Sequence, residues 1–439
     1  MSNGLRFMLG QALIFGLIGF CITRAAAAGD AAGAAPIPPG TKITMANWRQ
    51  YQQFMPDGMV VLFQGGQSWK MPDDVEIDVG PTIIHPLPKG YAEATEKYAA
   101  QVRLQTLDGG AHTLIGYVAG APFPNPSGPD AGWEILADNW FRYAPHLSVS
   151  TPERPITECV QDSYGNISCE QEMYVDRWLS RVTDPGVPMT DPAADGRFET
   201  RFGMVIEPEQ RKYTATLSVF YDDLAKLPAS YIFTPAERRV MQLSSGARCQ
   251  PSGGSDMTAD DYRYGFAGSI PEFSAQSLGD RKILALLNYK TPVGIFPANY
   301  DMPLGFPKPD WGKWEVRDVY VIDVRKIPSR AEGYCYGKRV MYIDKQFYGA
   351  LWLDLYDKNM RLWKVAHISP QAMEIPDIGM TSNAGSFSEQ FWDLINHHGT
   401  YDSSFNARGE TVYVNSQAPR EYDDVQKYSS PNGLSEVMR

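Results

Sequence analysis

Three pairs of adjacent ionisable residues are the parts of this sequence that could do chemistry: Asp222–Asp223, Asp260–Asp261 and His397–His398. Two neighbouring carboxylates can serve as acid and base where burial moves their pKa values apart. Acidic pairs more often begin turns or lie in solvent, and that is the plainer interpretation here. Adjacent side chains do not share a face of a strand or helix, so joint metal ligation by the two histidines is awkward. We expect no catalytic and no metal-ligating residues.

Sequence motifs of common catalytic and cofactor sites are absent. The chain contains no GxSxG, P-loop, HExxH or GxGxxG motif. His367 follows Trp363 and Val365 on a predicted strand, and we interpret it as a histidine buried in a sheet rather than as a base. We therefore expect a binding protein without a cofactor. If the protein is instead a hydrolase, Asp260 or Asp261 is the acid that we expect it to use.

The first 28 residues have the pattern of a cleaved secretory signal peptide. Arg6 precedes the apolar stretch Phe7–Ile22, and Ala25–Ala28 supplies the small residues of a cleavage site. Gln11 interrupts the stretch, which is too short for a convincing membrane-spanning helix. Cys21 follows a bulky aromatic residue where a lipoprotein signal requires a small one, so we predict no lipid anchor. The sequence predicts export to the periplasm.

Four cysteines lie beyond the signal peptide: Cys159, Cys169, Cys249 and Cys335. An oxidising compartment favours disulfides, and four cysteines allow three pairings. We favour Cys159 with Cys169, because Tyr164–Asn166 supplies a turn between them, and Cys249 with Cys335 follows by elimination. A metal site is the alternative, but no CxxC or HxxH spacing supports it.

The composition excludes several classes of partner. Cleavage of the signal peptide removes two arginines and no acidic residue, so the net charge of −11 becomes still more negative. Nucleic acids and anionic membrane surfaces both require clustered Lys and Arg, which argues against either partner. A hydrophobic content of 43% is that of an ordinary globular core.

The predicted elements are mostly strands. Helices are predicted over residues 44–55, ended by Pro56–Gly58, and over Tyr91–Ala100. On Trp314–Val324 the apolar face alternates with a face that carries Glu315, Arg317 and Asp323, and such alternation is typical of an antiparallel sheet with one wet face. The predicted strands are Val102–Thr106 and Thr113–Val118, joined by a turn at Asp108–Gly110, then Tyr213–Tyr221, Tyr231–Thr234, Arg239–Leu243, Trp314–Val324, Val340–Asp344, Trp352–Tyr356 and Leu362–His367.

An aromatic stripe follows the later predicted strands. Its members are Trp314, Tyr320, Tyr342, Trp352, Tyr356 and Trp363. Core packing explains any single one of them. Together they could exceed what one sheet face buries, and a curved sheet covered by helices could leave part of that surface as a ligand cavity. Our candidates for ligand-binding residues are Leu217, Val219, Phe233, Tyr320, Tyr342 and Trp352.

Several short motifs follow one another in a fixed order. They are Ala94–Tyr98, Ala119–Pro126, Phe233–Pro235 with Arg239–Met241, Asp261–Gly268, Trp314–Tyr320, Tyr342–Asp344 and Tyr356–Trp363. Their order and spacing resemble those of an uncharacterised secreted family of proteobacteria, domain of unknown function 1329. The resemblance extends from about Thr44 to Asp402.

That family is similar to the periplasmic lipoprotein carriers LolA and LolB. The resemblance implies a mainly β (α+β) fold in which a strongly curved antiparallel sheet forms an unclosed β-barrel with helices covering the open side. It also implies an apolar cavity, a lipid or other hydrophobic ligand, and partnership with a resistance-nodulation-division transporter and an outer-membrane protein. This chain is much longer than the short carriers, so its cavity could be filled or reshaped.

These expectations define the domain organisation and the function that we predict. A single LolA-like β domain spans residues 44–402, after a signal peptide (1–28) and an extended leader (29–43) and before a C-terminal extension (403–439). The function is that of a periplasmic carrier for a lipid or other hydrophobic molecule. Two alternatives stay open: a secreted enzyme acting on a lipid or glycan, and a ligand-free accessory subunit of an envelope transport complex.

Overall fold

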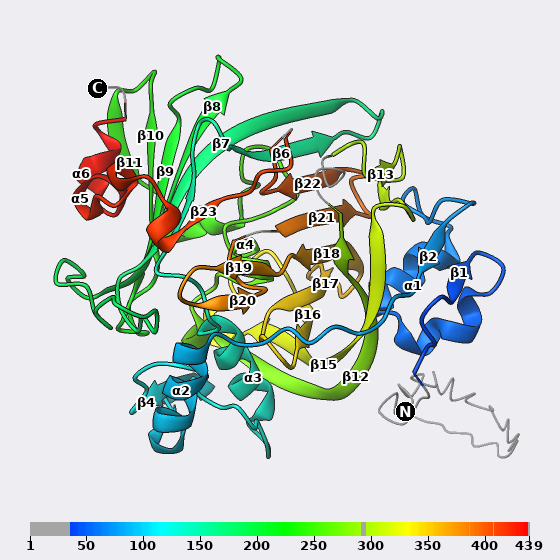
Figure 1. Ribbon diagram of the computed structural model, residues 1–439, viewed down its shortest axis with the longest axis horizontal. Helices are drawn as coiled ribbons and strands as arrows, with labels where there is room; N and C mark the ends of the chain where they lie inside the picture. Colours follow the sequence, from blue (N-terminus) through cyan, green and yellow to red (C-terminus); the bar gives the residue numbers. More distant parts are fainter. Residues whose placement is uncertain (1–35, 291–295, 386, 407, 438–439) are drawn as a thin grey trace, which may run out of the picture.

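A computed structural model describes residues 36–290, 296–385, 387–406 and 408–437 (Figure 1). The predicted signal peptide, with Cys21, lies outside the described residues. None of the helices in the described part has the length and apolar content needed to cross a membrane.

One sheet of 15 strands dominates the molecule, and all its strand pairs are antiparallel. Its two edge strands, β11 and β12, do not pair with each other, so the sheet is an unclosed barrel. From edge to edge the order is β11 (Arg239–Gln242), β10 (Ala229–Thr234), β9 (Ala215–Tyr221), β8 (Arg197–Glu207), β7 (Ile167–Trp178), β6 (Ile156–Gln161), β22 (Gly399–Ser403), β21 (Phe387–Asp393), β18 (Leu362–Pro370), β17 (Ala350–Tyr356), β16 (Lys338–Asp344), β15 (Gly312–Lys326) and β12 (Phe273–Tyr289). β5 (Leu147–Ser150) joins β7 to β23 (Tyr413–Val414).

Four small two-stranded sheets accompany this sheet. They are β1 (Lys42–Thr44) with β2 (Glu76–Asp78), β3 (Arg103–Thr106) with β4 (His112–Ile115), β13 (Tyr300–Asp301) with β14 (Phe306–Pro307), and β19 (Met373–Ile375) with β20 (Gly379–Thr381). The α-helices are α1 (Asp57–Gln64), α2 (Lys89–Tyr98), α3 (Ala131–Trp140), α4 (Tyr262–Gly265), α5 (Val425–Tyr428) and α6 (Pro431–Leu434). Short 3-10 helices span Trp48–Phe54, Ala99–Gln101, Asp108–Gly110, Ser245–Cys249, Ile270–Glu272, Pro328–Arg330, Asn415–Gln417 and Arg420–Tyr422.

The fold class predicted from the sequence is confirmed. Every strand of the predicted meander is present in the large sheet, and the predicted hairpin is β3–β4. The prediction of one helix over 44–55 is wrong in part. The segment forms a 3-10 helix, and Asp57–Gly58, expected to end the helix, instead begins α1. Gly58 permits this because α1 lies so close to the sheet that a Cβ at this position would stand 2.2 Å from Asp354 Oδ1.

The helix α3 packs against one face of the sheet beside the edge strand β12. Trp133, Leu136, Ala137 and Trp140 recur at helical spacing and are all buried. They form one core cluster with Tyr320 and Ile322 of β15 and with residues of β16–β18 and β21. We call this the α3 face of the sheet; alternate residues of each strand point to the opposite face.

Both faces of the central strands are buried, which corrects the expectation of one wet face. Glu315, Arg317 and Asp323 were expected in solvent but are 0%, 1% and 7% exposed. The long β12–β15 hairpin brings its far end over the opposite face, where Trp352 Nε1 donates to the Leu284 carbonyl at 3.0 Å. The central part of the antiparallel sheet is therefore covered by protein on both faces.

The structure contains two disulfides, and both are the predicted pairs. Cys159 and Cys169 stand directly opposite each other on β6 and β7. Cys249 and Cys335, 86 residues apart, tie the segment after β11 to the segment before β16.

Candidate binding interior

Three of the six candidate ligand-binding residues lie on the opposite face near the β11 edge. Leu217, Val219 and Phe233 are 0%, 3% and 3% exposed and belong to one cluster with Tyr428 and Leu434 of the C-terminal helices. Figure 1 shows α5 and α6, in red, beside β9–β11 at one end of the molecule. These three side chains therefore contact protein.

The other three candidates lie elsewhere. Tyr342 and Trp352 are neighbours on β16 and β17, in a different cluster of the opposite face. Tyr320 is on the α3 face and half-buried, with the Lys345 ammonium 4.6 Å from its ring centre. The structure thus distributes the six residues over three places, and their contact with a ligand stays a prediction.

His367 packs against two tryptophans that also contact each other, in agreement with its interpretation as a sheet histidine. Its ring centre is 4.9 Å from that of Trp314 and 4.4 Å from that of Trp352. Burial lowers the pKa of His367 to about 3. The imidazole is therefore neutral at physiological pH and serves in an aromatic stack.

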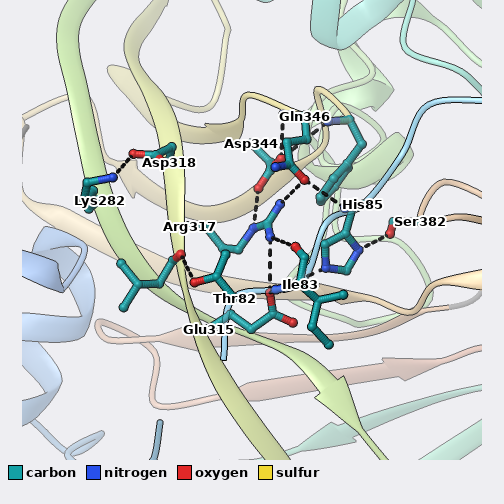
Figure 2. A network of polar contacts seen from close by, with 12 residues as sticks. Thr82, Ile83, His85, Lys282, Glu315, Arg317, Asp318, Asp344, Gln346 and Ser382 are labelled. Carbon is teal, nitrogen blue, oxygen red and sulfur yellow. Dashed lines mark hydrogen bonds and ion pairs between the residues drawn. The ribbon is translucent and has the colours of Figure 1, made fainter. Parts of the chain in front are cut away.

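The segment between β2 and α2 crosses the sheet and buries the polar side chains of β15 (Figure 2). Arg317 donates to Asp344 Oδ2 at 2.8 Å, to Glu315 Oε2 at 3.2 Å and to the Ile83 carbonyl at 2.6 Å. Ile83 N in turn donates to Glu315 Oε2 at 2.9 Å. His85 is 3% exposed and contacts the Ser382 hydroxyl at 2.5 Å. These partners explain why charged residues are stable on a buried strand face.

The α3 face has an apolar half and a charged half. The apolar half, on β15–β18 and β21, includes Ile322, Ile368 and Phe391, and α3 lies over its β12–β15 end. The charged half lies on β6–β8, β21 and β22. There Glu158 stands opposite both Asp402 and Glu170, and Asp402 stands opposite Glu389. We call Glu170, Glu158, Asp402 and Glu389 the carboxylate ladder.

Burial changes the protonation of this ladder. Burial, followed by repulsion from Asp402 and Glu172, raises the pKa of Glu158 well above its ordinary value. Burial and then Asp402 raise the pKa of Glu389 in the same direction. The pKa of Glu172, next along β7, rises to about 7, again mainly through burial. These groups therefore hold protons more strongly than solvent-exposed carboxylates.

The loop Pro251–Gly268 covers the charged half. Arg263 at its centre is 4% exposed, pairs with Glu199 of β8 at 2.7 Å and lies 4.2 Å from the Trp140 ring centre. Arg263 and Tyr264 have φ values of 61° and 55°, a left-handed conformation that is costly for residues other than glycine. The buried ion pair and the aromatic contacts hold the loop in this conformation.

The acidic pairs singled out from the sequence are engaged in structural contacts. Asp261 pairs with Arg339 at 2.9 Å and accepts hydrogen bonds from Thr258 and from the Tyr336 hydroxyl. Asp260 pairs with Arg248 at 2.6 Å. All of these partners are internal, which leaves neither carboxylate poised toward a substrate.

The remaining pairs also make structural contacts. Asp222 pairs with Arg181 at 3.1 Å, and Asp223 accepts a hydrogen bond from Ala225 N at 2.9 Å in a turn. His397 contacts the Ser68 hydroxyl at 3.4 Å, whereas His398 lies 3.9 Å from Asp256. Among the described residues no group of three or more His, Cys, Asp or Glu side chains is arranged to hold a metal ion.

A surface hollow of about 460 Å³ lies where loops from three parts of the chain meet. Its floor is Asp184, which accepts hydrogen bonds from Tyr143, His146 N and Asn415 at 2.8–2.9 Å. The carboxylate joins the segment before β5, the β7–β8 connection and the segment after β23. We interpret this hollow as a loop junction.

The fold and its interior thus define an unclosed antiparallel barrel with an internal polar region. The chain belongs to the family described as protein of unknown function DUF1329, whose model matches residues 42–434. The resemblance inferred from the short motifs is thereby confirmed. No curated protein matches the chain.

Solved structures similar to this chain include the following three. An outer membrane lipoprotein-sorting protein domain from Vibrio parahaemolyticus is 15% identical, with a TM-score of 0.46 over 69% of this chain and 98% of that one. A DUF1329 family protein from Desulfovibrio piger is 14% identical, with a TM-score of 0.46 over 69% and 100%. A LolA superfamily protein from Nitrosomonas europaea is 12% identical, with a TM-score of 0.38 over 67% and 97%.

Proposed function

We propose that this protein is a periplasmic binding or carrier protein for a lipid or other hydrophobic molecule. The observation that supports the proposal is the apolar half of the α3 face. It is covered by α3 at its β12–β15 end and by the loop Pro251–Gly268 over β17, rather than by a second sheet. A movement of α3 would open an apolar surface next to the sheet edge.

The physical basis is the cost of exposing hydrocarbon to water, about 0.8 kcal/mol per methylene group. A carrier must shield an apolar chain during transit and release it at its destination. The α3 helix meets β12 so closely that a Cβ on Gly132 would stand 2.5 Å from the backbone of Ala275–Ser277. Helix and edge strand therefore form a fitted contact that a ligand would have to displace.

A catalytic function is the weaker proposal. The carboxylates that it would use, Asp260 and Asp261, each pair with a partly or fully buried arginine. Partnership with a resistance-nodulation-division transporter and an outer-membrane protein stays a prediction, as does the role of ligand-free accessory subunit.

Two buried leucines give a matched test of the proposed surface. Leu136 on α3 and Leu217 on β9 are both 0% exposed, so replacing either with alanine should cost about 2–5 kcal/mol of stability. Only Leu136→Ala should change the affinity for the neutral fluorescent probe N-phenyl-1-naphthylamine. Lipids that copurify with the mature protein, identified by native mass spectrometry, would name the ligand class.

The two variants distinguish the structural proposal from the sequence-based one. If Leu217→Ala changes probe binding and Leu136→Ala does not, the ligand lies under the C-terminal helices. That is where three of the residues predicted from the sequence, Leu217, Val219 and Phe233, are found. If wild-type protein binds neither probe nor lipid, the carrier proposal is wrong.

A further inference from the structure

The carboxylate ladder brings like charges together across four neighbouring strands. Glu170, Glu158, Asp402 and Glu389 stand directly opposite one another on β7, β6, β22 and β21. Side chains at such positions have Cβ atoms about 4.5–5.5 Å apart, and like charges there are destabilising. Either protonation of its members or a cationic partner relieves this repulsion.

Most of the ladder has no such partner within the described residues. Glu170 pairs with Arg211, but Glu158, Asp402 and Glu389 form no ion pair with any described Lys, Arg or His. Asp402 is 6% exposed, and its Oδ1 has no hydrogen-bond partner among the described residues. A buried polar atom left in this state costs about 1–3 kcal/mol, and more when it is charged.

The nearest cations are engaged elsewhere. Arg201 of β8 pairs with Asp176 at 2.9 Å, and Arg263 pairs with Glu199 at 2.7 Å. The remaining cationic neighbour, Arg211, points to Glu170. Glu158, Asp402 and Glu389 are thus the ladder members without an ion pair among the described residues, with Glu172 beside them.

The surroundings of the ladder indicate what kind of cation fits. In the part of the chain that the structure describes, no group of three or more His, Cys, Asp or Glu side chains is arranged to hold a metal ion. Tyr262 of the covering loop is close enough to Glu158, Glu172 and Asp402 to interact with them electrostatically, and it packs against the apolar cluster of the α3 face. Glu389 stands opposite Ile368, and Phe391 follows on the same face of β21. Acidic groups therefore adjoin apolar ones.

We propose that the carboxylate ladder binds the ammonium group of an aliphatic amine whose hydrocarbon chain lies along the apolar half of the α3 face. An ammonium group offers three donors and can serve several carboxylates at once. This inference deepens the proposed carrier function and rests on it, because the hydrocarbon part uses the surface proposed there.

Three octyl compounds test the charge preference with one chain length. Octylamine, octanol and octanoate would each compete with N-phenyl-1-naphthylamine for the full mature protein at pH 8. We expect octylamine to bind about tenfold more tightly than octanol, a difference of about 1.4 kcal/mol. Octanoate should bind most weakly, because its charge has the same sign as the ladder.

Substitutions in the ladder test whether its carboxylates cause the preference for octylamine. The double variant Glu158→Gln, Asp402→Asn should lose most of the preference for octylamine over octanol and keep its affinity for octanol. Glu374→Gln removes one negative charge from an exposed position of β19 and should leave both affinities unchanged. If the double variant does not fold, Glu158→Gln alone takes its place.

The pH dependence gives an independent readout. The titratable groups that interact with the ladder are Glu172, Arg201, Arg211, Tyr262, Tyr264, Tyr300 and Asp261, besides its own members. The amine stays protonated between pH 5.5 and 8, whereas the ladder gains charge as the pH rises. Octylamine affinity should therefore increase several-fold over this range, while octanol affinity stays constant.

The outcomes separate this inference from the carrier proposal. If octanol and the neutral probe bind but octylamine is not preferred, or if the double variant weakens both equally, the ladder does not recognise cations and the carrier proposal stands. Octylamine binding without octanol or probe binding would support the ladder and refute the hydrophobic carrier. Failure of all three ligands and the probe would refute both.

Discussion

At the scale of single residues, two arginines on the same strand separate buried from exposed ion pairs. Arg317 is 2% exposed in its side chain and bound to Glu315 and Asp344, whereas Arg325 is 48% exposed and bound to Asp323. Arg317→Ala should cost about 3–5 kcal/mol, because it leaves two buried carboxylates unpaired. Arg325→Ala should cost less, about 1–3 kcal/mol, because it leaves a single buried carboxylate, that of Asp323, without its partner. Urea unfolding of both variants measures the difference, and equal costs would contradict the role of the Arg317 network.

The carboxylate ladder makes a second prediction at this scale. Its pKa values are raised in the folded state, so between about pH 4.5 and 7 the folded protein binds more protons than the unfolded chain. The stability that proton binding by the ladder contributes is therefore fully present below the pKa values of these carboxyl groups in the unfolded chain. It is lost as the pH rises through their values in the folded protein. Asp402→Asn should raise the free energy of unfolding at pH 8 by about 1–3 kcal/mol and change it little at pH 4.5. A destabilising effect at pH 8 would show that the charged form is preferred.

The sequence could identify some residues of the interior and not others. His367 was identifiable because it alternates with apolar residues on a strand. Glu315 and Arg317 were expected in solvent because alternation along β15 cannot reveal that residues 82–85, more than two hundred positions earlier, cover that face. The ladder was invisible for the same reason. Its members come from β7, β6, β22 and β21, and the β6–β22 pairing brings the two halves of the ladder together.

At the scale of elements, the two disulfides should differ in their contribution to stability. Removing the Cys159–Cys169 bond as a double serine variant should cost about 3 kcal/mol, and removing Cys249–Cys335 about 4–5 kcal/mol, since the longer loop gains more freedom in the unfolded chain. The sequence separations are 10 and 86 residues. Guanidinium unfolding of each variant provides the comparison. A larger loss for the short loop would mean that contacts in the folded state, rather than loop length, determine the effect.

Element prediction succeeded where local pattern and tertiary packing agree. The meander β15–β18 was predicted because alternation, aromatic content and the turn at Asp357 all favour strands. The Pro56–Gly58 sequence looks like a helix stop, yet Gly58 lies in α1, because close packing against Val365 and Asp354 requires a residue without a side chain. Such a requirement exists only once the sheet has formed.

At the scale of the whole molecule, the C-terminal helices complete a second core. Arg177 pairs with Asp423 at 2.7 Å, Thr200 donates to the Ser429 hydroxyl at 2.7 Å, and Tyr428 and Leu434 cover the β8–β11 end of the sheet. The segment thus contributes polar anchors as well as apolar contacts. In this region the described structure surrounds Leu217, Val219 and Phe233 with protein.

Deleting residues 419–439 should therefore destabilise one end of the sheet and spare the other. The lost burial of Tyr428 and Leu434 should cost about 3–6 kcal/mol. Hydrogen exchange should accelerate in β8–β11 and remain slow in β15–β18, which have their own cores, and the exposed Leu217 and Phe233 should increase binding of an apolar dye such as ANS. Octanol affinity should be retained if the ligand lies on the α3 face, because that face is covered by α3 rather than by the deleted helices. If the truncated protein is as stable as the full chain but no longer binds octanol, the C-terminal helices close a ligand pocket around Leu217, Val219 and Phe233, and the α3 face is packed core.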